Sequence, residues 1–195
     1  MLLIDARAAY LQKDYKRVLA HAERINRAGD TINQSIKLQA FSLYHLGRYE
    51  EAITWLKRMK DDQKAEQQYF YLSMANFRLN HLAKAEEYMQ MAVNASVSPS
   101  LGDYYTQLGI VYEAEGKDRD AIGMYKKAYE LTENENLLYR LALISEDYYA
   151  DISIAEGYFE FYLAKSDSAQ TFYREYARQR LDEIKAARFF DTDSI

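Results

Sequence analysis

Four alanines recur along this sequence at nearly constant intervals, each within a charged stretch that favours helix. Ala52, Ala85, Ala121 and Ala155 lie 33, 36 and 34 residues apart. A further step of 34 residues upstream reaches Val18, in a segment of similar character. Self-similarity with a period of about 20 to 50 residues is typical of stacked structural units, each made of one supersecondary element. The sequence therefore predicts an array of five repeats.

Turn signals divide the repeats into two apolar-periodic halves. Leu46-Gly47, Leu79-Asn80 and Glu115-Gly116 mark this division in units two, three and four. Gly and Asn tolerate the left-handed backbone conformation that commonly ends a helix. The pattern predicts two helices of about 12 to 15 residues in each unit. The single proline, Pro99, is expected in the first turn of the helix that opens unit four.

The fourth unit carries the fullest version of the motif, with its pattern residues at Tyr105, Leu108, Gly109, Tyr112, Gly116, Ala121, Tyr125 and Ala128. This pattern resembles the tetratricopeptide repeat (TPR) family, whose repeat of about 34 residues places small side chains where its paired helices cross. The resemblance implies close contact at Gly109 and Ala121. It also implies an all-α fold, a right-handed α-solenoid of about five helix-turn-helix units followed by a C-terminal capping helix.

We place the unit boundaries at residues 1–32, 33–65, 66–101, 102–134 and 135–168. An amphipathic segment at residues 169–190 follows, with Tyr173, Ala177, Leu181 and Ile184 on one stripe. Because the last unit of a stack leaves an apolar face exposed, we expect this segment to cap it. Residues 191–195 are expected to be a flexible tail. The ending is similar to that of bacterial envelope-associated TPR proteins, which favours the periplasm or cell envelope and leaves the cytoplasm open.

Composition and charge argue against several classes of function. The net charge of −5 opposes general nucleic-acid binding, which needs a basic surface, and no apolar run is long enough for membrane insertion. The chain has no cysteine, and its three histidines lie apart from one another without metal-ligand spacing. No glycine-rich phosphate loop is present. We therefore predict no enzyme, no cofactor and no metal site, and expect a protein or peptide partner.

The TPR resemblance implies a concave groove lined by the first helix of each unit. The residues that would point into it are Lys37, Phe41, Tyr44, His45, Phe70, Met74, Phe77, Arg78, Asp103, Gln107, Ile110, Glu113, Tyr139, Leu143, Glu146 and Asp147. The N-terminal half of this groove is aromatic with cationic edges, and its C-terminal half is acidic. A competing interpretation is that some of the aromatic side chains pack between adjacent first helices.

One well-understood TPR ligand can be tested against the sequence. Some TPR proteins hold a terminal carboxylate with Lys, Asn, Asn, Lys and Arg on three successive first helices. The matching residues here are Lys37, Phe41, Tyr71, Asp103 and Gln107, so the first lysine alone is kept. Asp103 would repel a carboxylate. We predict instead a scaffold that binds an extended or helical segment of a partner protein.

The first unit has no capping segment before it in this sequence, which leaves two further hypotheses open. The chain is a sensory or regulatory TPR domain of a longer protein, or a second copy covers the apolar N-terminal edge and forms a homo-oligomer. A third hypothesis, an all-helical enzyme, would need a cluster of polar side chains that the sequence does not show.

Overall fold

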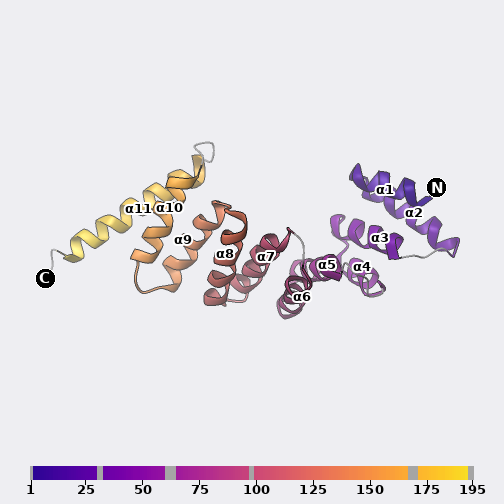
Figure 1. Cartoon of the computed structure of the whole chain (residues 1–195), viewed down its shortest axis with the longest axis horizontal. Helices are drawn as coiled ribbons and strands as arrows, with labels where there is room; N and C mark the ends of the chain where they lie inside the picture. The colour runs from indigo at the N-terminus through magenta and orange to yellow at the C-terminus, as the bar shows by residue number, and fades with distance from the viewer. Residues whose placement is uncertain (1, 30–32, 60–64, 97–98, 167–170, 193–195) are drawn as a thin grey trace. The chain divides into compact units, whose positions relative to one another are not determined.

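The computed structural model describes residues 2–29, 33–59, 65–96, 99–166 and 171–192. These residues form eleven α-helices and include no strand, which confirms the all-α fold class (Figure 1). Contacts divide the chain into two compact units, Met1–Val97 and Ser98–Ile195. We name them the N-terminal part and the C-terminal part.

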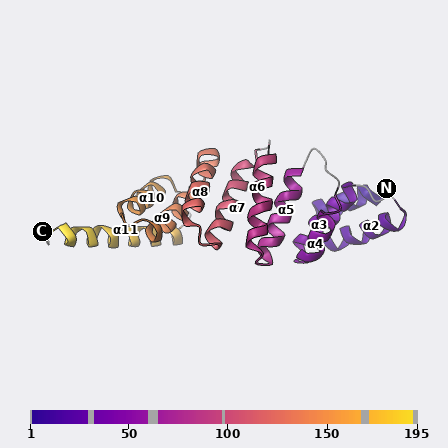
Figure 2. The same ribbon diagram turned by 90° about the horizontal axis from the view of Figure 1, so that it is seen from below.

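In the N-terminal part, the described helices form three consecutive helix-turn-helix pairs (Figure 2). The pairs are α1 (Leu2–Leu11) with α2 (Tyr15–Arg27), α3 (Asn33–His45) with α4 (Tyr49–Leu56), and α5 (Ala65–Arg78) with α6 (Leu82–Ala95). The first helices also contact one another, α1 with α3 and α3 with α5. Small side chains such as Ala40, Ala52, Ser73 and Ala85 are fully buried where the paired helices meet. Their size allows the two backbones to approach closely.

The C-terminal part contains two further pairs and the last helix. The pairs are α7 (Leu101–Ala114) with α8 (Asp118–Thr132) and α9 (Asn136–Tyr148) with α10 (Ser153–Lys165), followed by α11 (Thr171–Thr192). Ala177, Leu181 and Ile184 of α11 are buried against a cluster that includes Leu138 and Phe159. The expected capping role of this helix is confirmed, because its apolar stripe covers the last pair.

One turn geometry recurs between the helices of a pair. Gly47, Asn80 and Gly116 have φ values of 75°, 59° and 71°, which confirms the left-handed conformation predicted from their residue types. The residue after each of them donates its backbone N–H to a carbonyl five residues earlier. These bonds, each 2.9 Å long, join Arg48 to Leu43, His81 to Asn76, and Lys117 to Tyr112. They engage carbonyl groups of the last helical turn, where the regular helical donors run out.

The first pair makes the same turn with Lys13, whose φ is 58°. We expect Lys13→Gly to raise the free energy of unfolding of the N-terminal part by about 0.5 to 1 kcal/mol, because a Cβ is strained in this conformation and glycine is not. Chemical denaturation measures the change. Lys13→Ala keeps the Cβ and is the control. An equal gain in both variants would show that the lysine side chain, and not the backbone, causes the cost.

Helix α4 is shorter than the sequence predicted. It ends at Leu56 after eight residues, where a range of about 12 to 15 was expected. The carbonyl of Leu56 accepts a hydrogen bond from the buried amide of Gln68 on α5, at 2.8 Å. A side chain on the next helix thus satisfies the backbone at this helix end. Sequence periodicity carries no signal of such a contact.

Two expectations about unit four have different outcomes. The close approach at Gly109 is confirmed, since a Cβ added there would lie 2.5 Å from a ring carbon of Tyr125 on α8.

The placement of Pro99 within a helix is wrong. Helix α7 begins at Leu101 with Ser100 as its N-cap, so the proline precedes the helix. A proline has no N–H to donate, which suits the position before a helix as well as its first turn.

Candidate functional site

The residues predicted to line the groove lie on first helices in both parts. In the N-terminal part, Lys37, Phe41, Tyr44 and His45 belong to α3, and Phe70, Met74, Phe77 and Arg78 belong to α5. In the C-terminal part, Asp103, Gln107, Ile110 and Glu113 belong to α7, and Tyr139, Leu143, Glu146 and Asp147 belong to α9. Each part therefore presents its own candidate surface.

Aromatic rings gather around α3 in the N-terminal part. This α3 aromatic cluster consists of Tyr10, Tyr15, Phe41, Tyr44, His45 and Tyr71. Phe41 stacks on Tyr71 with 3.8 Å between ring centroids, and His45 stacks on Tyr15 at 4.6 Å. Tyr44 meets Tyr71 edge-on at 5.2 Å. Such arrangements add stability beyond the burial of the rings.

Within the α3 aromatic cluster, Phe41 is a packing residue. Only 6% of its surface is exposed, and its ring lies between α3 and α5. Its assignment to the groove wall is therefore corrected, because an approaching partner would not reach it. His45 remains exposed to solvent. Partial burial of its ring, and secondly the charge of Lys13, lower the pKa of His45.

An apolar stripe on α5 remains partly open. Phe70, Met74 and Phe77 are half-buried, while Arg78 at the end of the helix is exposed. Their spacing of four and three residues places the three apolar side chains on one side of α5. Lys37 of α3 lies beside this helix, where its ammonium donates to the Gln67 side chain.

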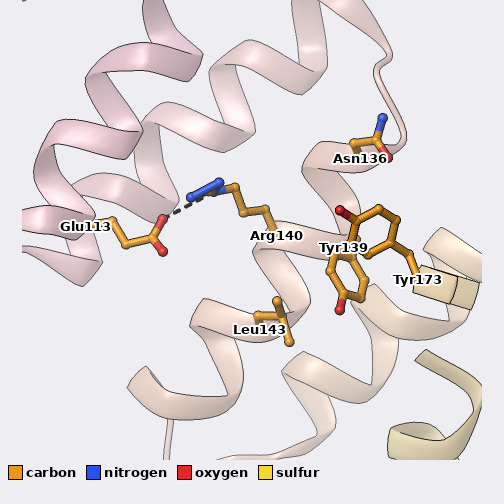
Figure 3. Close-up of a pocket in the computed structure, with 6 residues that line it drawn as sticks. All are labelled: Glu113, Asn136, Tyr139, Arg140, Leu143 and Tyr173. Atoms are coloured by element: carbon orange, nitrogen blue, oxygen red, sulfur yellow. Dashed lines mark hydrogen bonds and ion pairs between the residues drawn. The ribbon is translucent and has the colours of Figure 1, made fainter. Parts of the chain in front are cut away.

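A cavity of about 480 Å³ opens in the C-terminal part. It is lined by Glu113 of α7, by Tyr173 of α11, and by four residues of α9, which are Asn136, Tyr139, Arg140 and Leu143. Figure 3 shows Arg140 extending toward Glu113, with the rings of Tyr139 and Tyr173 lying together on the other side. The sequence predicted three of these residues for the groove, Glu113, Tyr139 and Leu143. We call this cavity the α9 pocket.

A hydrogen-bond network fixes one wall of the α9 pocket. The hydroxyl of Tyr125 donates to Oε2 of Glu113 at 2.6 Å, and Nε of Arg140 lies 3.3 Å from the same oxygen. Nε of Arg140 also donates to the Tyr125 hydroxyl oxygen at 3.0 Å. Burial, followed by the bond to Glu113, raises the pKa of Tyr125, so its hydroxyl keeps the proton that it donates. The Glu113 carboxylate is thereby held in one orientation.

The C-terminal surface is less acidic than the sequence indicated. Glu113 is ion-paired with Arg140, and Glu146 is ion-paired with Arg180 of α11. Asp103 and Asp147 are exposed, and Gln107 and Ile110 are half-buried. Arg140 was not among the residues predicted to line the groove. It lies three residues before Leu143, a spacing that places both side chains on one side of a helix. That spacing is the signal that would have identified it.

The capping helix builds part of the pocket as well as covering the core. Near its start, Arg174 donates to the carbonyl of Leu163 at 2.9 Å and to the hydroxyl oxygen of Ser166 at 2.6 Å. Further along, Nε of Arg180 donates to Glu146 of α9 at 2.6 Å. These contacts hold α11 against both α9 and α10. They position Tyr173, which lines the α9 pocket. The sequence did not predict this role for Tyr173.

The described residues also bear on metal binding and on membrane crossing. Among the described residues, no group of three or more His, Asp or Glu side chains is placed to hold a metal ion. Within the same ranges, no helix combines the length and the apolar character needed to cross a bilayer. The α9 pocket has aromatic walls and oriented hydrogen-bonding groups.

No protein-family model and no curated protein sequence matches this chain. Solved structures do match it. The crystal structure of YrrB, described as a TPR protein with an unusual peptide-binding site, superposes with a TM-score of 0.72, covering 89% of this chain and 88% of YrrB at 14% sequence identity. The chain has the TPR fold.

Further structures support the same fold. The structure of a thermophilic TPR protein from Thermus thermophilus matches with a TM-score of 0.59 and 18% identity, covering 95% of this chain and 97% of its own. The crystal structure of MamA has a TM-score of 0.75 and 20% identity, and covers 86% of this chain and 97% of its own. The fold class predicted from the alanine spacing and the TPR motif is confirmed.

Proposed function

We propose that this TPR chain is a non-catalytic scaffold that binds a peptide or helical segment of a partner protein. The observation that carries the proposal is the α9 pocket, a cavity of about 480 Å³ bounded by two first helices and the capping helix. Small-molecule sites are commonly concave, of about 300 to 1,000 Å³, with apolar walls and a few oriented polar groups, and peptide recognition also uses pockets that receive single side chains. Tyr139, Leu143 and Tyr173 supply the walls, and Glu113 and Arg140 supply the polar groups.

The nature of the walls favours a protein ligand. Aromatic side chains provide large contact areas at a low cost in conformational entropy, which is why Tyr and Trp are enriched where proteins bind one another. Tyr173 is 48% exposed and thus accessible to an incoming side chain. The likeness to YrrB, whose description includes a peptide-binding site, is consistent with this function.

The α5 stripe is the second proposed contact surface. Phe70, Met74 and Phe77 are half-buried along one side of the helix, and Arg78 adds a positive charge at its end. Residues spaced in this way can receive apolar side chains of a partner segment. Because α5 lies in the N-terminal part and the α9 pocket in the C-terminal part, we treat the two as separate surfaces.

Selection from a displayed library of random peptides tests the function without a known partner. We expect selected peptides to bind the full chain saturably, and Tyr173→Ala to weaken binding about tenfold, because one hot-spot aromatic contributes more than about 1 kcal/mol. Fluorescence anisotropy with a labelled peptide measures the affinity. Phe77→Ala tests the α5 stripe in the same assay.

Tyr148→Ala is the matched control for the α9 pocket. Tyr148 is 40% exposed at the end of α9 and does not line the cavity. Its replacement should leave peptide affinity unchanged. If no peptide is selected, or if Tyr173→Ala and Phe77→Ala both bind every selected peptide as the original chain does, the proposed function is wrong.

A further inference from the structure

We infer that the α9 pocket selects an uncharged amide group next to an aromatic or aliphatic side chain, and discriminates against carboxylate and ammonium groups in the same place. The inference rests on the proposed function and specifies the chemistry of the partner segment. It applies to a stretch of extended chain whose backbone amide reaches Glu113 and Arg140.

The charges of the pocket compensate each other. Glu113 and Arg140 form an ion pair, and each side chain keeps 39% of its surface exposed. Asn136, Tyr139, Leu143 and Tyr173 complete the lining and carry no formal charge. A ligand therefore meets a polar wall whose net charge is close to zero. A charged ligand of either sign gains no net electrostatic attraction from such a wall, and it loses hydration on entering the pocket.

The pair has further hydrogen-bonding groups, and both side chains line the pocket and are partly exposed. The contacts described above engage Oε2 of Glu113 and Nε of Arg140. A guanidinium carries further N–H donors on its two Nη atoms, and a carboxylate has a second acceptor oxygen. The wall thus offers donors and an acceptor side by side. An amide has the complementary arrangement, because its C=O accepts from Arg140 while its N–H donates to Glu113.

The rest of the pocket fits the side chain beside that amide. The rings of Tyr139 and Tyr173 have centroids 5.2 Å apart and planes inclined by 58°. Rings at such angles leave edges and faces on which another aromatic ring can pack. Leu143, one turn after Arg140 on α9, adds an aliphatic side chain to the lining (Figure 3). A neutral segment with one large apolar side chain satisfies both walls at once.

Three small probes with the same phenyl ring test this selection on the full chain. N-acetyl-L-phenylalaninamide is neutral, N-acetyl-L-phenylalanine carries a carboxylate, and L-phenylalaninamide carries an ammonium group. Titration followed by NMR chemical shifts of the pocket residues gives their relative affinities. We expect the neutral probe to bind at least about fivefold more tightly than either charged probe. A charged probe loses favourable hydration on entering the pocket, and the pocket has no net opposite charge to compensate for that loss.

Two substitutions should change the preference in opposite directions. Glu113→Gln leaves Arg140 without its counter-charge, so the carboxylate probe should gain about fivefold relative to the neutral one. Arg140→Gln leaves Glu113 negative, so the ammonium probe should gain instead. Glu175→Gln and Arg178→Gln make the same exchanges at exposed positions on α11 and serve as controls. They should leave the order of the three probes unchanged.

The outcomes separate this inference from the proposed function. A carboxylate or ammonium probe that binds the original chain most tightly overturns the selection for neutral groups, and so does the absence of binding by all three probes. In either case the peptide-selection assay still decides whether the chain binds peptides at all. Loss of the neutral preference in Glu113→Gln and Arg140→Gln, with its retention in both controls, supports the assignment to the ion pair.

Discussion

Phe41→Ala is expected to lower the free energy of unfolding of the N-terminal part by about 3 to 4 kcal/mol. Truncation of a buried phenylalanine removes its apolar contacts and leaves a cavity, at a cost of about 3 to 5 kcal/mol in well-packed cores. Phe41 is 6% exposed, packs in a cluster with Ala40, Leu56 and Leu72, and stacks on Tyr71. The substitution therefore weakens the packing between α3 and α5.

Hydrogen exchange measures this loss helix by helix. Protection of backbone amides in α3 and α5 should fall in Phe41→Ala, because stability in a stacked repeat protein depends on contacts between neighbouring units. Phe77→Ala is the matched control, since the same residue type is half-buried on α5. It should cost about 1 kcal/mol or less. If the protection of α3 and α5 is unchanged in Phe41→Ala, Phe41 is not a packing residue and its assignment to the groove wall stands.

Gly109→Ala should lower the free energy of unfolding of the C-terminal part by about 2 kcal/mol. The added Cβ would lie 2.5 and 2.7 Å from two ring carbons of Tyr125. That ring is fully buried, and its hydroxyl is bonded to Glu113, so it has little freedom to move away. Overpacking of this kind costs about 1 to 3 kcal/mol or more, which exceeds the gain of about 1 kcal/mol from replacing glycine in a helix.

Gly123→Ala is the control for this prediction. Gly123 also lies inside a helix, α8, but a Cβ added there meets nothing within 4 Å. The substitution should therefore raise the free energy of unfolding by about 0.5 to 1 kcal/mol. Urea denaturation of both variants compares them. If both substitutions stabilise the protein, the close approach of α7 to α8 at Gly109 does not constrain the fold.

The helical architecture could be predicted because its causes are local. A small residue every 33 to 36 positions and turn residues between the helix pairs are visible in the chain itself. Gly47, Asn80 and Gly116 adopt the left-handed conformation that their residue types favour. Lys13 does the same without such a residue type, because the two helices that it joins impose the turn.

The binding surface was harder to predict because burial depends on partners far along the chain. Phe41 and Phe77 have the same side chain and lie on first helices, yet Phe41 is buried and stacks on Tyr71, while Phe77 is half-buried. The carboxylates of Glu113 and Glu146 meet arginines 27 and 34 residues away. The acidic character expected from composition is therefore reduced by pairing that a count of charges does not include.

The repeat, the helical class, the main turns and the capping role of the last helix could all be predicted from the sequence. These follow from residue size, periodicity and backbone preference, which act within one unit or between its neighbours. The sequence could not predict where α4 ends, which aromatic side chains stay accessible, or that α11 supplies Tyr173 to the α9 pocket. Each of these depends on how side chains from separate helices meet in space, where contact distance sets both burial and charge pairing.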